Sequence, residues 1–476
     1  MSKYGKIVFL VVVVAGGLFF SCQKEDYLRG PDVKLQFSTD TVFFDTVFTT
    51  VGSTTRSFTV HNPYNKALKI ASVRLGRGAS SPYQLNVDGM AGYEVTDVEI
   101  LPRDSLYVFV QVTIDPLGDN MPLLVQDSVI FTLNGGEQDV DLVAWGQDVH
   151  LINGLVIETQ TWENDKPYLI SHSMLVDTAQ TLTVKPGVRI YSHFGSTIYV
   201  SGTLIIQGTE DEPVLISGDR LEVMYEDIPG QWSGIYFLNG SSNNSIDHAI
   251  IQNGIYGVHL GNFYSEDPFP DLHISNTVIQ HMNFAGISSV GAMIRAENCV
   301  IADCGGYALS LTTGGDYRFI HCTVANYWNW SNRTNPSLVL TNYYNMGDTV
   351  VFTGDLVRAD FLNMIIYGSE NAEVGLSSIS DEVDFQYYFD HCLLKVKDPE
   401  DYTDTTHFHE VFLNHDPGFV SVAEYDYQLD SLAFARDKGD LQTGLMVPLD
   451  LLGNSRVADG HPDPGAYERI DSTSAR

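Results

Sequence analysis

Between residues 248 and 394 the hydrophobic positions follow one short pattern that occurs six times. Each copy has a His or Asn, then a small or thiol-bearing residue, and two places later an aliphatic residue. The copies begin at His248-Ala249, Asn276-Thr277, Asn298-Cys299, His321-Cys322, Asn363-Met364 and His391-Cys392, and they close on Ile251, Ile279, Ile301, Val324, Ile366 and Leu394. The intervals of 28, 22, 23, 42 and 28 residues are one period of about 22 with insertions, which predicts a solenoid.

In such a solenoid each repeat places a strand on the previous one, about 4.8 Å away. The second and fourth positions of the pattern lie two apart on a strand, so both should point into the core. The leading His or Asn should lie at the turn, where its side chain can bind backbone groups. The sequence therefore predicts a parallel β-helix.

The positions between the two inward rows should point outward, and five of the six are apolar. They are Ile250, Val278, Val300, Thr323, Ile365 and Leu393. A soluble monomer rarely leaves so long an apolar stripe exposed. We expect the C-terminal segment, from about residue 412 to residue 467, to fold back over it. The first domain or a partner protein could cover the stripe instead.

Residues 33–147 show the two-residue rhythm of half-buried strands. Leu106, Val108, Val110, Val112 and Ile114 alternate with more polar or aromatic neighbours, and turn signals such as Asp88-Gly89 and Asn134-Gly135 separate such runs. The ordered elements, among them Phe58-Thr59-Val60-His61-Asn62 and Ala144-Trp145-Gly146, resemble an immunoglobulin-like β-sandwich of bacterial surface proteins. The resemblance implies a spacer or interaction module.

Five cysteines are present, and three of them, Cys299, Cys322 and Cys392, occupy the same inward position of the repeat. Free cysteine packs as a small hydrophobe, so these thiols are interpreted as core residues. Metal binding or nucleophilic chemistry is the alternative, but neither a C-x-x-C nor an H-E-x-x-H spacing occurs. The sequence gives no reason to expect a metal site or a cofactor.

The N-terminus has the layout of an export signal. Lys3 and Lys6 precede the apolar run 7–20, which is too short to span a bilayer, and Cys22 follows it. This arrangement resembles the lipobox of bacterial lipoproteins, and Gln23-Lys24-Glu25-Asp26 resembles the export signal of Bacteroidetes surface lipoproteins. The resemblance implies a signal peptide over 1–22, acylation of Cys22, a tether over 23–32, and outer-membrane lipid as the partner of a cell-surface protein.

Several further motifs are similar to right-handed parallel β-helices of the pectate-lyase-like group. Pro186-Gly187-Val188 and Trp232-Ser233-Gly234-Ile235 look like first coils, so residues 150–396 are assigned to this fold. Asp416-Pro417-Gly418 and Asp463-Pro464-Gly465 are similar to the closing tail of such proteins, which makes 397–470 a C-terminal cap. Residues 432–439 depart from the tail's usual Ser-Pro-Ala-Ile-Asp-Ala-Gly run. The group includes polysaccharide lyases and hydrolases, and many members of no known activity.

Charge narrows the possible partners. The 26 basic against 60 acidic residues give a net charge of −34, which phosphate backbones would repel, so no nucleic-acid partner is expected. A lyase for acidic sugars needs a cation to neutralise the substrate carboxylate. The basic residues between 186 and 396 are few and far apart in sequence: Arg189, Arg220, Arg295, Arg318, Arg333, Arg358 and Lys395.

A glycoside hydrolase would need carboxylates that converge on one groove. Glu297, Asp303 and Asp316 could do so, although solvated surface positions are the simpler interpretation in so acidic a chain. His248, His321 and His391 could act as bases, but their shared place in the repeat favours a role in the turns. These observations favour a protein that is not an enzyme.

Aromatic insertions are the candidate binding residues. They are Phe263, Tyr264, Tyr327, Trp328, Trp330, Tyr343 and Tyr344. Aromatic rings next to amide and hydroxyl groups suit sugars, which have apolar faces and hydroxyl edges. The alternative is that these rings pack long loops onto the solenoid. The leading hypothesis is a lipid-anchored surface protein that binds extracellular glycans. A polysaccharide lyase or glycoside hydrolase on the same scaffold, and a structural or adhesive surface protein, are the alternatives.

Overall fold

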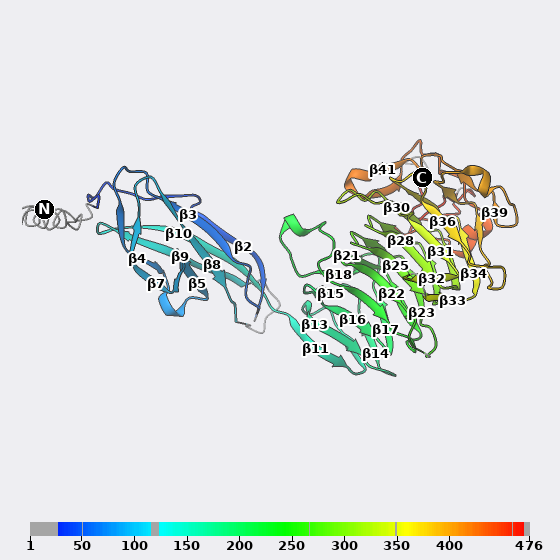
Figure 1. Cartoon of the computed structure of the whole chain (residues 1–476), viewed down its shortest axis with the longest axis horizontal. Helices are drawn as coiled ribbons and strands as arrows, with labels where there is room; N and C mark the ends of the chain where they lie inside the picture. The colour runs from blue at the N-terminus through cyan, green and yellow to red at the C-terminus, as the bar shows by residue number, and fades with distance from the viewer. Residues whose placement is uncertain are drawn as a thin grey trace, which may run out of the picture. The chain divides into compact units, whose positions relative to one another are not determined.

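The computed structural model describes residues 27–49, 51–115, 123–265, 267–347, 350–458 and 460–470. The expected signal peptide, Cys22 and the first part of the tether lie outside the described residues. The chain divides into two compact units, Met1–Asp148 and Val149–Arg476. The protein is essentially all-β, as predicted (Figure 1). Among the described residues, no helix is both long and apolar enough to cross a bilayer.

The first unit consists of two five-stranded sheets that enclose one hydrophobic core. One sheet has the order β1-β3-β8-β5-β6 and the other the order β2-β10-β9-β4-β7. The strands are β1 (Gln36–Phe37), β2 (Thr41–Phe48), β3 (Arg56–His61), β4 (Leu68–Leu75), β5 (Tyr83–Val87), β6 (Met90–Gly92), β7 (Glu94–Ile100), β8 (Ser105–Val112), β9 (Leu123–Leu133) and β10 (Gly136–Gln147), with the 3-10 helix η1 (Gly78–Ser80). In β8 every second residue is buried, as the alternation predicts. Asp88-Gly89 and Asn134-Gly135 form left-handed turns that join β5 to β6 and β9 to β10.

The second unit is built from two long parallel sheets, which is consistent with a β-helix-like fold. The larger sheet has 18 strands: β11 (His150–Ile157), β13 (Tyr168–Val176), β15 (Arg189–Ser192), β16 (Thr197–Val200), β18 (Val214–Gly218), β19 (Gly234–Phe237), β21 (Ala249–Gln252), β22 (Tyr256–Leu260), β24 (Val278–Gln280), β25 (Ala285–Val290), β27 (Val300–Ala302), β28 (Tyr307–Thr312), β30 (Thr323–Asn326), β31 (Leu338–Thr341), β35 (Ile365–Gly368), β36 (Val374–Ser377), β38 (Leu393–Leu394) and β40 (Phe412–Leu413).

The smaller sheet has 10 strands: β12 (Gln160–Trp162), β14 (Thr181–Val184), β17 (Thr203–Gln207), β20 (Asn244–Asp247), β23 (Asp271–Ser275), β26 (Met293–Glu297), β29 (Gly315–Ile320), β34 (Leu356–Leu362), β37 (Tyr388–Asp390) and β39 (Phe408–His409). Two hairpins stand apart: β32 (Tyr343–Met346) with β33 (Val350–Thr353), and β41 (Phe419–Ser421) with β42 (Asp426–Leu429). The short helices are η2 (Val223–Tyr225), η3 (Pro399–Tyr402), η4 (Val422–Glu424) and α2 (Leu441–Met446).

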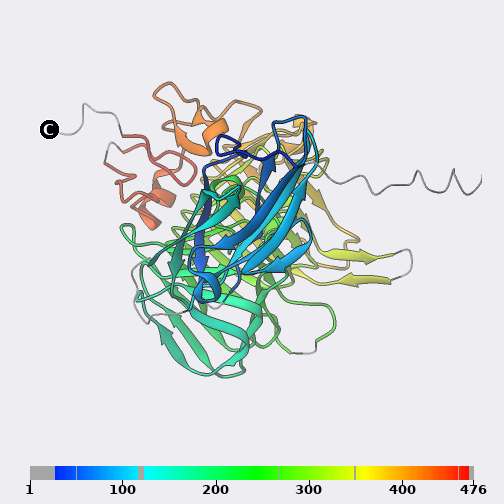
Figure 2. The ribbon, with the colours of Figure 1, turned by 90° about the vertical axis from the view of Figure 1, so that its left-hand side faces the viewer.

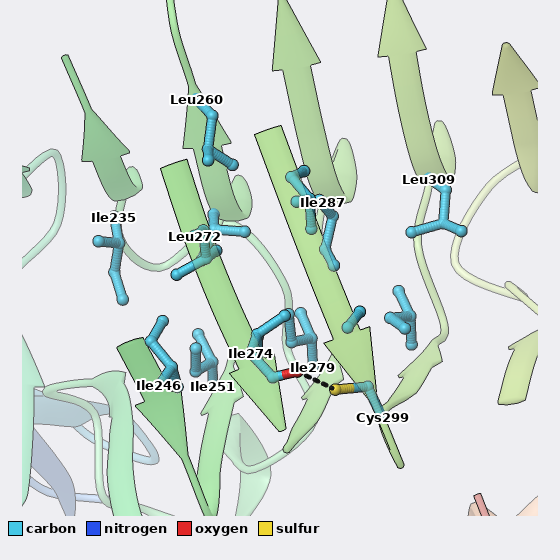
Figure 3. Packing of buried hydrophobic residues seen from close by; sticks show 14 of the residues in the cluster. Ile235, Ile246, Ile251, Leu260, Leu272, Ile274, Ile279, Ile287, Cys299 and Leu309 are labelled. Atoms are coloured by element: carbon cyan, nitrogen blue, oxygen red, sulfur yellow. Dashed lines mark hydrogen bonds between the residues drawn. The ribbon is translucent and has the colours of Figure 1, made fainter. Parts of the chain in front are cut away.

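One coil is a strand of the smaller sheet followed by one or two strands of the larger sheet, for example β20, β21 and β22. The two inward rows of the repeat are buried in every copy, with exposures between 0 and 2%. Figure 3 shows part of this core, where the Cys299 thiol donates to the carbonyl of Ile274. Burial raises the pKa of the Cys392 thiol to about 12. The cysteines therefore pack as neutral core residues.

The leading His or Asn of each copy joins the two sheets at a sharp corner. All six have a left-handed backbone with φ between 47 and 51°: His248, Asn276, Asn298, His321, Asn363 and His391. Asn and His are enriched in this conformation among non-glycine residues. His and Asn therefore suit the corner positions because of their backbone preference, as well as because of the hydrogen bonds their side chains can make.

The C-terminal segment covers the outward stripe, as predicted. Val300 packs with Tyr427, Leu451 and Ala466 in one cluster, and the amide of Ala466 donates to the Thr323 hydroxyl at 2.9 Å. In a second cluster Ile365 and Leu393 pack with Leu429.

The coils continue further than residue 396, where the motifs end. Strands β39 and β40 add one more layer to both sheets, up to Leu413. Only the chain after this layer forms the covering segment.

Candidate functional site

A groove of about 420 Å³ lies on the outer face of the second unit, over strands β22, β25, β28 and β31. Its lining includes outward residues of successive coils. His259, Ser288, Ser310 and Val339 are consecutive Cα partners across the four strands. Because like positions stack in this fold, one row of side chains supplies a continuous floor.

Aromatic rings form a second row along the floor. The rings of Tyr256 and Phe284 have centroids 5.3 Å apart, and those of Phe284 and Tyr307 are 5.9 Å apart. Tyr256 and Tyr307 are both Cα partners of Ala285, and all three rings line the groove. Burial, and then the neighbouring Tyr344, raise the pKa of both tyrosines, so their hydroxyls stay protonated at neutral pH.

Two insertions that are distant in sequence form the wall of the groove. Phe263 stacks on Tyr344 of β32, with ring centroids 4.8 Å apart, and on Phe352 of β33 at 4.6 Å. The hairpin β32–β33, drawn in yellow, and the loop after β22 extend from the same side of the coils (Figure 2). Phe263, Tyr343 and Tyr344 all line the groove.

His259 is a neutral hydrogen-bonding group of the floor. Its Nδ1 lies 3.1 Å from the Ser288 hydroxyl, and burial lowers its pKa to about 4. At neutral pH the imidazole is therefore uncharged, with one nitrogen that donates and one that accepts.

The groove is uncharged although the chain as a whole carries a net charge of −34. Its described lining has no Asp, Glu, Lys or Arg: Tyr256, His259, Phe263, Phe284, Ser288, Val290, Tyr307, Ser310, Thr312, Val339, Thr341, Tyr343, Tyr344 and Asn345. Rings, hydroxyls and an amide are groups that bind neutral polar ligands. A pair of carboxylates, the usual machinery of glycoside hydrolysis, is absent from these residues.

The remaining aromatic candidates lie outside the groove's lining. Tyr264 is 74% exposed next to the hairpin, where its ring meets Phe352 edge-on. Tyr327 packs against Phe419 and Tyr427 of the covering segment. Trp328 is 6% exposed and its indole donates to Ser331, whereas Trp330 is 49% exposed. The structure therefore brings together three of the seven predicted residues.

Sequence reasoning missed Tyr256, Phe284 and Tyr307, which complete the groove. Each lies at or near the start of the third strand of a coil, outside the short pattern that revealed the repeat. A comparison of whole coils, with these aromatic positions aligned, could have found them.

The three carboxylates weighed for hydrolysis do not converge. Asp303 is 1% exposed and accepts from His281 Nδ1 at 2.7 Å. Asp316 pairs with Met293 at one end of β26, whereas Glu297 lies at the other end.

Stacking also gathers basic residues that are far apart in sequence. Asp316 binds both Arg295, at 2.8 Å, and Arg358, at 2.9 Å, on neighbouring strands of the smaller sheet. Residues that are far apart in sequence therefore meet here, because neighbouring strands of the sheet come from successive coils. Both guanidinium groups bind Asp316, and Arg358 also lies 3.9 Å from Asp360. These four side chains therefore carry no net positive charge that could receive an acidic sugar.

Comparisons with known proteins show only slight likeness. The chain matches no protein-family model and no curated protein. Among solved structures, a protein of unknown function from Porphyromonas gingivalis W83 is 12% identical with a TM-score of 0.19, over 26% of this chain and 60% of that one. The catalytic domain of a GH87 alpha-1,3-glucanase in complex with nigerose is 11% identical with a TM-score of 0.17, over 71% of this chain and 81% of that one. Likeness at this level carries no functional argument.

Proposed function

We propose that the protein binds extracellular glycans in the groove between Phe263, Tyr344 and the aromatic floor. The observation that carries the proposal is an uncharged, aromatic, hydroxyl-rich groove on a strongly acidic protein. Stacked rings bind the apolar faces of sugars, and hydroxyl and amide groups bind their edges. The lack of paired carboxylates in the described lining favours binding over cleavage.

The proposed setting is the bacterial cell surface. In this proposal the chain is held in the outer membrane by lipid on Cys22, and an immunoglobulin-like sandwich separates the anchor from a right-handed parallel β-helix that carries the groove. The export-signal pattern of residues 1–22 supports the anchor. The two five-stranded sheets and the long parallel sheets are compatible with the two modules.

A glycan array with the chain lacking residues 1–22 tests the binding function. We expect a neutral glycan to bind, and Tyr344→Ala to weaken that binding two- to tenfold, since one aromatic contact contributes about 0.5–1.5 kcal/mol. Trp330→Ala is the matched control, because Trp330 is exposed but lies outside the groove's lining. Equal losses in both variants, or no binding to any glycan, would contradict the proposal. Released sugar products in the same samples would instead select the lyase or hydrolase.

The lipid anchor is tested by Cys22→Ser with fatty-acid labelling in cells. A single acyl chain holds a protein only marginally, so stable anchoring needs the full acylation that starts at this cysteine. We expect the parent to incorporate label and the variant to lose it and leave the membrane fraction. Cys392→Ser is the matched control, because Cys392 is fully buried in the core. Continued labelling of Cys22→Ser would exclude the anchor.

A further inference from the structure

Two adjacent coils bring four potential metal ligands to one corner of the second unit. Asp390 ends β37 and His409 ends β39, and the two residues are Cα partners in the smaller sheet. His391 and Glu410 follow them at the corner, both with a left-handed backbone, at φ 49° and 46°. The four residues are therefore two stacked pairs, Asp390-His391 below and His409-Glu410 above.

Three of these side chains already converge on a single point. His391 Nδ1 lies 2.6 Å and His409 Nδ1 lies 2.8 Å from the same oxygen of Asp390. The ligand atoms of the three residues lie within 4.8 Å of one another. The His409 side chain is 51% exposed, so the cluster is open to solvent.

A second corner of the same protein shows what this arrangement looks like without the second imidazole. Asp247-His248 repeats the lower pair, with His248 Nδ1 3.1 Å from Asp247. The next coil there supplies Ser275 and Asn276, and both donate hydrogen bonds to the same Asp247 oxygen, at 2.7 and 2.9 Å. Neutral donors thus satisfy Asp247, whereas Asp390 faces two imidazoles, which are common metal ligands.

We propose that Asp390, His391 and His409 bind a divalent transition-metal ion of the Zn²⁺ class. Two imidazoles and a carboxylate are a common ligand set for Zn²⁺, and they leave coordination positions open. A tetrahedral ion with bonds of about 2.0–2.2 Å separates its ligand atoms by about 3.3 Å. The N–O separations must therefore widen by roughly half an ångström, which side-chain rotation at an exposed corner allows.

The surrounding charge favours a cation at this corner. Glu410 and Asp440, the residue that caps α2, are acidic residues that act electrostatically on His391 in addition to Asp390. Sequence reasoning assigned His391 to the turns and did not consider His409. The cluster appears only when residues 19 positions apart are stacked in register.

Competition between the full-length protein, in a zwitterionic detergent, and a chromophoric zinc chelator tests the site. We expect one equivalent of Zn²⁺ to bind and to raise the thermal midpoint. His409→Ala should lose that equivalent and its midpoint shift. His248→Ala, at the corner with neutral donors, should retain both.

Asp390→Asn provides a second variant that keeps a hydrogen-bond acceptor but removes the anionic ligand. We expect it to weaken zinc binding at least tenfold with an unchanged circular dichroism spectrum. Zinc binding that is equal in the parent, His409→Ala and His248→Ala would show adventitious surface binding and overturn the proposal. The absence of a bound equivalent in the parent would overturn it as well.

Discussion

At the scale of single residues, the inward rows determine how much each side chain contributes to stability. Ile301 and Cys322 are both fully buried in neighbouring coils. We expect Ile301→Ala to lower the free energy of unfolding by about 2–5 kcal/mol, since it removes three carbons from a packed core. Cys322→Ala removes one sulfur atom and should be mild. Urea melts measure both, and equal negligible losses would show that the repeat is assigned in the wrong register.

His259 makes the stability of the fold depend on pH in the acidic range. An unfolded histidine titrates near 6.5, whereas the pKa of His259 in the fold is about 4. Between these values the unfolded chain binds the additional proton, so protonation favours unfolding and stability falls as pH decreases from about 6.5 to 4.

The test compares thermal midpoints of the parent and His259→Asn across this pH range. Asparagine keeps a polar contact for Ser288 and does not titrate. We expect the midpoint of the parent to fall more steeply than that of the variant between pH 6.5 and 4. Parallel curves for the two proteins would show that protonation of His259 does not cause the loss of stability.

At the scale of elements, a buried ion pair holds the long insertion after β30. Arg333 binds Glu373 through two hydrogen bonds of 2.7 and 2.9 Å, and both side chains are fully buried. The same carboxylate also accepts from the Ser337 hydroxyl at 2.6 Å. This contact fixes the chain between the coil corner and β31, next to the strands that carry the groove.

Glu373→Gln should lower the free energy of unfolding by about 3–5 kcal/mol, because it leaves a buried guanidinium without its counter-charge. The control is Glu137→Gln in the exposed pair with Arg74, which should cost less than about 1 kcal/mol. Chemical denaturation measures both variants. A loss at Glu373 no larger than the loss at Glu137 would show that the insertion is held by other contacts.

At the scale of the whole second unit, the C-terminal segment covers the apolar stripe. The stripe therefore does not need a partner protein to cover it. Arg456 is fully buried, and it donates to Asn298 of the corner row at 2.8 Å and to the carbonyl of Ala466 at 2.9 Å. The segment is thus attached to the coils by polar contacts as well as by its apolar clusters.

Truncation after residue 414 keeps the last coil and removes the cover. We expect the truncated protein to bind more of a hydrophobic dye and to aggregate at a lower temperature, since Val300, Ile365 and Leu393 lose their covering residues. Truncation after residue 470 is the control and should behave like the parent. If the shorter form were as soluble and heat-stable as the parent, the segment would not be needed to cover the stripe.

The candidate site was only partly predictable. Phe263, Tyr343 and Tyr344 could be found because aromatic clusters stand out in insertions, but the same reasoning selected Trp328, which the fold buries. Whether an inserted ring faces solvent or packs on a coil depends on what lies next to it in space. For Tyr327 the neighbours are Phe419 and Tyr427, about 100 residues later in the chain.

The sequence by itself determined the repeat, the two inward rows, the corner residues and the need for a cover. These features depend on strand periodicity and backbone preference, which act within a few residues and recur in every coil. Only the tertiary structure decided the groove, the Arg333–Glu373 contact and the cluster of Asp390, His391 and His409. Each of these joins side chains from different coils or insertions. Their meeting depends on register and insertion geometry, for which a sequence pattern has no local signal.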